Sequence, residues 1–174
     1  MGEINVEFPK LSWEERYRRM LDIAYTAVMT ADQLIHDNVE DQEKAWAMVE
    51  TIHSSFSRGC AKRLIQKYNL KPTVEDALKL FLLYSCEVWG YGATEYVSAK
   101  LEGPKRGVYA NLVCRGWELA KRSGTVEMLK KLPCSRSCFA EYKGLLTELS
   151  PALKLTMTKA YPWGNDRCEF VIES

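Results

Sequence analysis

Cysteines are the residues of this sequence best suited to chemistry, and four of the six lie in its last third: Cys114, Cys134, Cys138 and Cys168. A thiolate is a nucleophile and a metal ligand, whereas a neutral buried thiol packs as a small hydrophobe. Cys114, Cys138 and Cys168 fall in three different expected elements. The pattern therefore indicates either a shared site or three separate packing residues.

The neighbourhood of Cys138 favours more than packing. Ser135 is a candidate N-cap, and apolar residues recur at helical spacing from Cys138 until Pro151. This places the thiol on the buried face of a first helical turn, where the helix dipole favours thiolate. Glu141 follows one turn later, within side-chain reach of Cys138.

Other candidates have simpler explanations. Cys60 and Cys86 fall within helical patterns and are expected to pack, and a Cys-x3-Cys spacing from Cys134 is a weak signal. His36 and His53 are expected to be structural, at the end of the first helix and beside the buried face of the second. With no Cys-x2-Cys pair and no histidine near the cysteines in sequence, this is not a standard zinc signature.

Aromatic residues offer a candidate pocket between helices and sheet. Trp89, Tyr161 and Trp163 flank the expected strands, and ligand pockets favour aromatic side chains with a few polar groups. Ordinary core and edge packing is the alternative explanation.

Two hairpins are expected to position these residues. Residues 153–160 and 167–173 alternate apolar and polar side chains, as half-buried strands do, with turn residues Pro162 and Gly164 between them. Residues 93–101 and 108–114 flank a second turn at 103–107. Cys168 is expected to face the core with Phe170, and Cys114 to face it with Val108.

Three helices are expected before the sheet. Ser12 and Glu15 form a capping box ahead of a long helix whose stripe includes Met20 and Leu34. A second helix is expected from about Gln42 to Tyr68, with its buried face formed by Ala45, Val49, Ile52, Phe56, Cys60 and Leu64. A third begins after Thr73 and ends at 90–92.

The fold class that follows is α+β: three N-terminal helices packed on a four-stranded antiparallel sheet, with two helices inserted between its hairpins. A chain of 174 residues can bury one core and is too short for two independent ones. We expect a single domain over residues 1–174, with a helical half at 1–90 and a sheet half at 91–174.

Charge and hydropathy narrow the function classes. A net charge of +1 without a basic stripe argues against a nucleic-acid partner. No apolar run approaches a membrane span, and no secretory signal is apparent. Six cysteines without such a signal predict the reducing cytoplasm. The expected partner is a small molecule, and a homo-oligomer is allowed.

The C-terminal motifs resemble a known family. Cys114, the series Cys138-x-x-Glu141, and the run from Leu155 through Gly164 to Cys168-Glu-Phe170 are similar to the closing motifs of the L-2-amino-thiazoline-4-carboxylic acid hydrolase family. Glu stands here where that family has Asp, both after Cys138 and after Cys168. The resemblance covers about the last 65 residues.

The resemblance implies hydrolysis of a small cyclic, amidine-like or thiazoline-type carbon–nitrogen bond. Cys138 or Cys114 would be the catalytic nucleophile, Glu141 the acid or base, and Cys168 a further wall of the substrate site. No cofactor is required by this chemistry. No histidine is expected beside the thiols, which argues against a papain-like mechanism.

A second resemblance implies a different class of function. Cysteine-containing small-molecule sensor domains of the vinyl-4-reductase type are similar in outline, with helices against an antiparallel sheet and an apolar pocket. In that interpretation Cys114, Cys138 and Cys168, together with Glu141, would ligate a zinc ion. The protein would then bind a ligand without turning it over. A structural or partner-binding domain is the third alternative.

Overall fold

The computed structural model describes residues 12–90, 96–131 and 134–174. Within these ranges the helices are α1 (Trp13–Asn38), α2 (Gln42–Tyr68), α3 (Val74–Glu87), α4 (Arg115–Ser123), α5 (Val126–Lys131) and α6 (Cys134–Leu149). The strands are β1 (Val97–Gly103), β2 (Arg106–Asn111), β3 (Lys154–Lys159) and β4 (Cys168–Glu173), with a 3-10 turn, η1 (Tyr161–Trp163), before β4.

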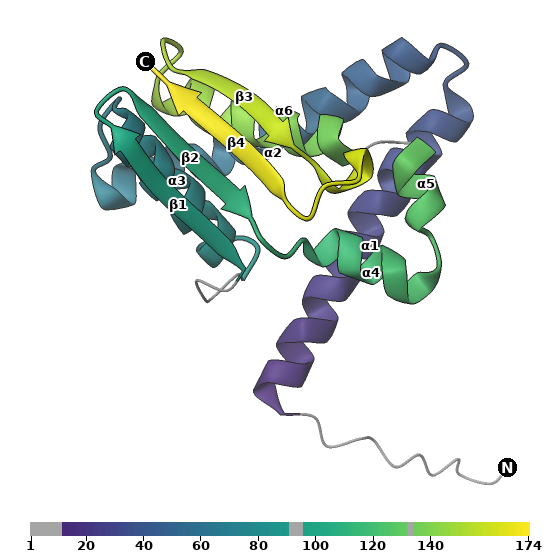
Figure 1. Ribbon diagram of the computed structural model, residues 1–174. Helices are drawn as coiled ribbons and strands as arrows, with labels where there is room; N and C mark the ends of the chain where they lie inside the picture. Colours follow the sequence, from purple (N-terminus) through teal and green to yellow (C-terminus); the bar gives the residue numbers. More distant parts are fainter. Residues whose placement is uncertain (1–11, 91–95, 132–133) are drawn as a thin grey trace, which may run out of the picture.

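The strands form one antiparallel sheet in the order β1-β2-β4-β3 (Figure 1). Both expected hairpins are confirmed, and β2 and β4 join them edge to edge. The segment between the hairpins contains α4 and α6, with the six-residue α5 between them. The α+β class is therefore confirmed. The expected first strand began at residue 93, and residues 93–95 lie outside the described ranges.

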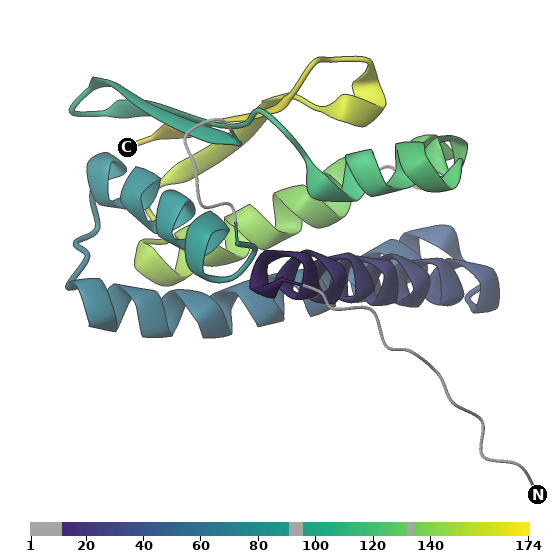
Figure 2. The same cartoon turned by 90° about the horizontal axis from the view of Figure 1, so that it is seen from below.

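The sheet covers a double layer of helices (Figure 2). Helices α3 and α6 lie directly beneath the sheet, and α1 and α2 lie beneath them. The main hydrophobic core fills the space between sheet and helices, and its largest fully buried side chains are Tyr84, Tyr109, Phe81 and Phe170. Helices α4 and α5 lie beyond the end of the sheet, next to α1 (Figure 1). A smaller hydrophobic cluster of Trp117, Ala120 and Leu129 lies there, with Met29 of α1 packed against it.

Local capping chemistry sets the helix starts. Ser12 and Glu15 form the expected capping box of α1. Asp41 accepts from two backbone N–H groups at the start of α2, and Thr73 accepts from one at the start of α3. These caps depend only on residues three or fewer positions apart, so the sequence predicts the helix starts. Helix α2 begins at Gln42 and ends at Tyr68, as predicted.

The buried faces of α1 and α2 differ in part from the predicted ones, although Ala45, Val49 and Leu64 of α2 are buried as predicted. Met20 and Leu34 of α1 are 55% and 56% exposed, and Ile52 and Phe56 of α2 are 53% and 49% exposed. The inward stripe of α1 instead consists of Tyr25, Val28, Met29, Asp32, Gln33 and His36, and that of α2 passes through Ala45, Val49, His53, Ser57, Ala61 and Leu64. The apolar pattern was a poor guide to the buried face, because several inward-facing residues of both helices are polar.

The predicted orientation of β2 is also wrong. Tyr109 lies in the core opposite Phe170, and Asn111 is paired with Cys168. Because side chains alternate along a strand, Val108 faces away from the helices. The strand ends at Asn111, so Cys114 lies beyond it, at the N-cap of α4.

Helices α6 and α2 approach each other closely at Gly144. A Cβ at this position would lie 2.7 Å from the backbone oxygen of Ser54 and would also clash with the hydroxyl of Ser57. We expect Gly144→Ala to lower the free energy of unfolding by about 1 to 3 kcal/mol, the usual cost of overpacking. Urea unfolding measures the difference.

Gly59 of α2 provides the matched control, because a Cβ there meets nothing within 4 Å. Gly59→Ala is expected to stabilise the protein by about 0.5 to 1 kcal/mol, since glycine is a poor helix former. Equal effects of the two substitutions would contradict the close approach of the helices.

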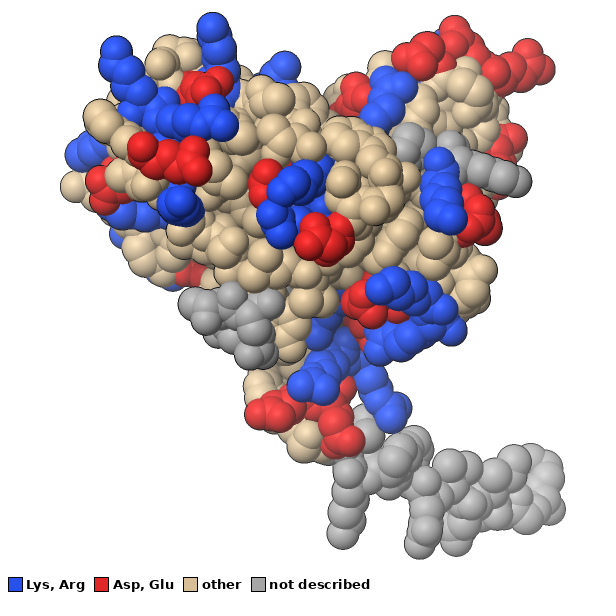
Figure 3. All heavy atoms as spheres, in the orientation of Figure 1, with Lys and Arg blue, Asp and Glu red and all other residues tan. Residues whose placement is uncertain are grey.

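The charged residues are mixed in sign. On the face drawn in Figure 3, Lys and Arg side chains are interspersed with Asp and Glu, and many form ion pairs, such as Arg106 with Glu102. Within the described residues, each helix is too short or too polar to cross a membrane.

Candidate functional site

A cavity of about 140 Å³ lies at the end of the core, where α1, α2, α4 and α6 meet the sheet. Its described lining is mainly apolar and aromatic, with a few polar side chains. The aromatic members are Tyr25, Trp46, Trp89, Trp117 and Tyr142, and the polar and ionisable ones are Asp32, Gln33, His36, His53, Asn111, Ser137 and Glu141. Ligand sites commonly combine an apolar wall with a few convergent polar groups.

The structure brings the predicted cysteines together around this cavity. Cys114 at the N-cap of α4, Cys138 on α6 and Cys168 on β4 all line it, and Cys134 joins them from the start of α6. These four thiols are close enough for a negative charge on one to raise the pKa of another. Cys60 and Cys86 do not line the cavity.

The expected thiolate at Cys138 is not favoured. Helix α6 begins at Cys134, so Cys138 lies in the second turn rather than the first. Burial raises the pKa of Cys138 well above its usual range, and the neighbouring thiols and Glu141 raise it further. Burial also raises the pKa of Cys168 to about 12. The pKa of Cys114 is raised by burial, which the nearby amides of Trp117 and Gly116 only partly offset.

The described residues do not form the zinc site of the alternative interpretation. Over residues 12–90, 96–131 and 134–174, no group of three or more His, Cys, Asp or Glu side chains is arranged to hold a metal ion. This includes the set of Cys114, Cys138 and Cys168.

Three side chains in the lining of the cavity form an ionic chain. His53 of α2 lies between Asp32 of α1 and Glu141 of α6: its Nε2 is 3.1 Å from Asp32 Oδ2, and its Nδ1 is 3.5 Å from Glu141 Oε2. Burial alone would lower the pKa of His53, but the hydrogen bonds and charges of the two carboxylates outweigh it and raise the pKa to about 9. The imidazole is therefore protonated at neutral pH.

Glu141 is tied into the core by two further donors. Its Oε1 accepts from the indole N–H of Trp89 at 2.7 Å and from the hydroxyl of Tyr84. Glu141 is only 8% exposed, and a buried charge requires several hydrogen-bond partners. In turn, burial and the negative charge of Glu141 raise the pKa of Tyr84.

A second buried network lies behind the cavity wall. The hydroxyls of Tyr109 and Tyr142 both donate to Asn111 Oδ1, at 2.7 and 3.2 Å, and Ser85 bonds to both tyrosines. These bonds link α3, β2 and α6. They hold the polar tips of the aromatic wall in fixed positions.

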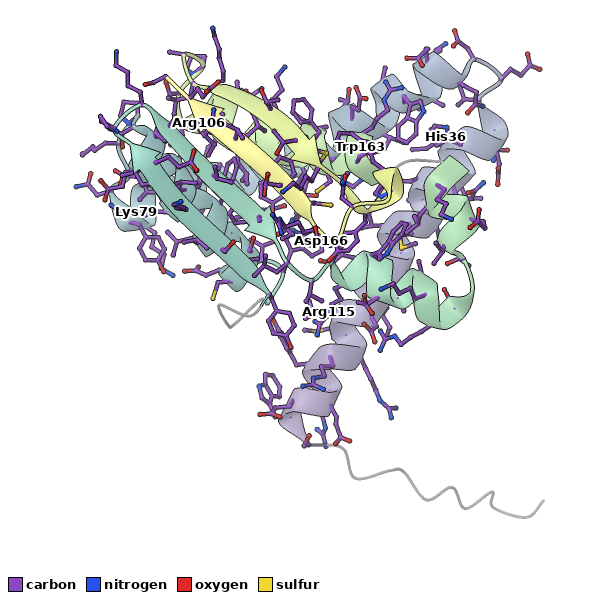
Figure 4. All side chains as sticks on the ribbon, in the orientation of Figure 1. His36, Lys79, Arg106, Arg115, Trp163 and Asp166 are labelled. Carbon is purple, nitrogen blue, oxygen red and sulfur yellow. The ribbon has the colours of Figure 1, made fainter. Side chains whose placement is uncertain are left out.

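The predicted aromatic pocket is confirmed for one of its three residues. Trp89 follows α3, lines the cavity and packs against Tyr25, with ring centroids 4.8 Å apart. Tyr161 lies outside the lining; it stacks on Trp117 and donates to the backbone oxygen of Leu112. Trp163 also lies outside the lining and is 55% exposed, in the turn before β4 (Figure 4).

Sequence reasoning missed Asp32 and Gln33, and assigned His36 and His53 to structural roles. His36 lies near the C-terminal end of α1 (Figure 4) and lines the cavity with the other three. The available signal was helical spacing: Met29, Asp32, Gln33 and His36 share one face with Tyr25. A charged residue on the inward face of a helix is a signal for a binding site. The signal was missed because the inward face of α1 was predicted incorrectly in part.

Comparison with known proteins supports the fold. No family model and no curated protein sequence matches the chain. A solved structure is similar: the trafficking protein particle complex subunit 3 from Naegleria fowleri, covalently bound to palmitic acid. The two chains are 14% identical, with a TM-score of 0.56 over 90% of this chain and 94% of that chain. At this identity the likeness shows a shared architecture and leaves the function to be argued from the site.

Proposed function

We propose that this protein binds a small organic molecule in the cavity between α1, α2, α4, α6 and the sheet. The observation that carries the proposal is the lining: an apolar, aromatic wall on which an ionic chain, Asp32–His53–Glu141, converges from three helices. Burying ionic groups lowers the stability of a fold relative to apolar residues, so folding alone does not explain them. Their retention beside a cavity is typical of a binding site.

The size of the cavity limits the ligand. At about 10 to 15 Å³ for each water-sized group, 140 Å³ accommodates a molecule of roughly ten non-hydrogen atoms. The similar trafficking-complex subunit is covalently bound to palmitic acid, so a domain of this architecture can hold an apolar molecule. For the present cavity a compact ring compound fits better than a long chain.

A blocking substitution tests the site. Gly116 lines the cavity, and a Cβ on it would make only ordinary contacts, the nearest 3.5 Å from Tyr25. We expect toluene and benzyl alcohol to show saturation-transfer NMR signals with the native protein and none with Gly116→Leu, whose side chain fills the cavity. Met29→Trp, from α1, is a second block should the first variant fail to fold.

Gly59→Leu is the control, because this residue is exposed on α2 and has open space around it. It should retain the signals of both probes. Retention of the signals in the folded blocking variants would refute the proposed ligand site.

A cysteine-dependent hydrolase is the second candidate, favoured by one observation: Cys138 and Glu141 border the same cavity. Hydrolysis of a cyclic amidine or thiazoline would require a thiolate to attack the carbon, while an acid delivers a proton to the departing nitrogen. Two facts oppose it. The pKa of Cys138 is raised, and Glu141 already accepts from Tyr84 and Trp89.

Thiol reactivity separates these two functions. We expect iodoacetamide at neutral pH to alkylate the exposed Cys86 first and to modify Cys138 and Cys114 at least about tenfold more slowly, because only thiolate reacts and burial suppresses it. Peptide mapping by mass spectrometry measures each rate. If Cys138 or Cys114 reacts faster than Cys86, the hydrolase becomes the better proposal.

The same thiols support a cytoplasmic location as a proposal. All six cysteines are free in the structure, as is usual for proteins in a reducing compartment.

A further inference from the structure

The charged side chains of the cavity are mainly acidic. Its described lining contains the carboxylates of Asp32 and Glu141 but no Lys or Arg. The one cation there, His53, is already paired with both carboxylates. With a protonated His53, these three groups carry a net charge of −1. The cavity therefore favours a positive ligand over a negative one.

His36, which also lines the cavity, has a buried ring nitrogen without a partner among the described residues. The amide nitrogen of Gln42 donates to the backbone oxygens of His36 and Val39, at 3.2 and 3.1 Å, so its oxygen accepts from His36 Nδ1 at 2.9 Å. In the neutral ring, Nε2 is then the unprotonated nitrogen. His36 is only 6% exposed, and among the described residues Nε2 has no hydrogen-bond partner.

Gln33 adds a second unpartnered acceptor, one turn before His36. Its amide nitrogen donates to Asp37 Oδ1 at 2.5 Å, which leaves the oxygen as the free end. That oxygen is buried and, over the part of the chain that the structure describes, makes no hydrogen bond. Buried acceptors without donors are rare and costly. Two of them beside Asp32 require hydrogen-bond donors from elsewhere.

The wall suits the body of such a donor. Tyr25, Trp46, Trp89 and Trp117 surround the cavity, and aromatic faces attract organic cations as well as apolar groups. Arg136 covers one face of Trp46 from outside the lining, and its charge is balanced by Glu43 and Glu50. It therefore does not make the cavity positive.

We propose that the ligand is an organic cation, a protonated amine on a compact apolar or aromatic body, whose ammonium group donates to Asp32, Gln33 and His36. The inference rests on the proposed ligand-binding function and specifies its ligand class. The amine supplies the donors that the two bare acceptors lack, and its charge offsets the excess carboxylate.

Three ring compounds of similar size test the ligand class by titration calorimetry at pH 7: benzylamine, which is cationic, benzyl alcohol, which is neutral, and benzoate, which is anionic. We expect benzylamine to bind about tenfold or more tightly than benzyl alcohol and benzoate to bind weakest. Asp32→Asn and Gln33→Leu should each reduce the affinity for benzylamine and leave that for benzyl alcohol within about twofold.

The matched control is Asp22→Asn, an acidic residue of α1 that pairs with Arg122 and does not line the cavity. It should bind benzylamine as the native protein does. Equal affinity for benzylamine and benzyl alcohol, or an unchanged Asp32→Asn variant, would overturn the cation preference and leave the ligand site standing. Failure of all three probes to bind would overturn both proposals.

Discussion

Glu141→Ala is expected to lower the free energy of unfolding by about 3 to 5 kcal/mol, the cost of breaking a buried charged network by removing one partner. The substitution leaves the hydroxyl of Tyr84 and the indole N–H of Trp89 without an acceptor, and it leaves His53 with one carboxylate in place of two. Urea unfolding at pH 7, monitored by tryptophan fluorescence and circular dichroism, measures the loss.

Two variants show whether the loss comes from this network. Glu141→Gln keeps an oxygen for Tyr84 and Trp89, so it should cost less than alanine, and it should lower the pKa of His53 because one anionic neighbour is gone. Glu148→Ala removes a carboxylate from the same helix that pairs with the half-exposed Arg58. Such surface pairs contribute below about 1 kcal/mol. A Glu141→Ala loss as small as that of Glu148→Ala would contradict the network.

Stability is expected to fall by about 3 kcal/mol as the pH rises from 6.5 to 9, owing to His53. The folded protein holds the His53 proton with a pKa of about 9, against the ordinary value of 6.5. Each unit of pKa difference corresponds to 1.36 kcal/mol. Because the folded pKa is the higher one, the folded state binds more protons within this window, and unfolding becomes easier as they are lost.

His53→Gln isolates this contribution. The variant lacks the titrating imidazole, so the difference between its urea stability and that of the native protein should shrink steadily from pH 6.5 to 9. The proton NMR signal of the His53 ring gives the pKa directly. A midpoint near 6.5, or a stability difference that does not change with pH, would show that the two carboxylates do not hold the proton.

These predictions concern polar groups on the inward faces of α1, α2 and α6, where apolar residues would give a more stable core. Asp32, His53 and Glu141 come from three helices and meet at one cavity. Groups that lower the stability of the fold are commonly found at functional sites, where the function requires them. The unpartnered acceptors of Gln33 and His36 follow the same logic, since a ligand that donates to them would stabilise the folded state.

The local features of the chain were predictable from its sequence. The capping box at Ser12, the bounds of α2, both hairpins and the inward direction of Cys168 all depend on residues close in sequence. Capping, turn chemistry and strand alternation act over a few residues, so one chain segment contains the whole signal. The α+β class follows from the order of those segments.

The site depended on contacts that no local pattern records. The inward faces of α1 and α2 were misassigned in part. His53 is stabilised by Asp32 and Glu141, which are far away in sequence, while apolar Ile52 and Phe56 remain exposed. The protonation of the cysteines was misjudged for the same reason. A helix position alone favours thiolate, but burial by elements from the whole chain raises the pKa of Cys138. Sequence determines which groups are available, and tertiary packing decides their solvation and partners, and hence their charge.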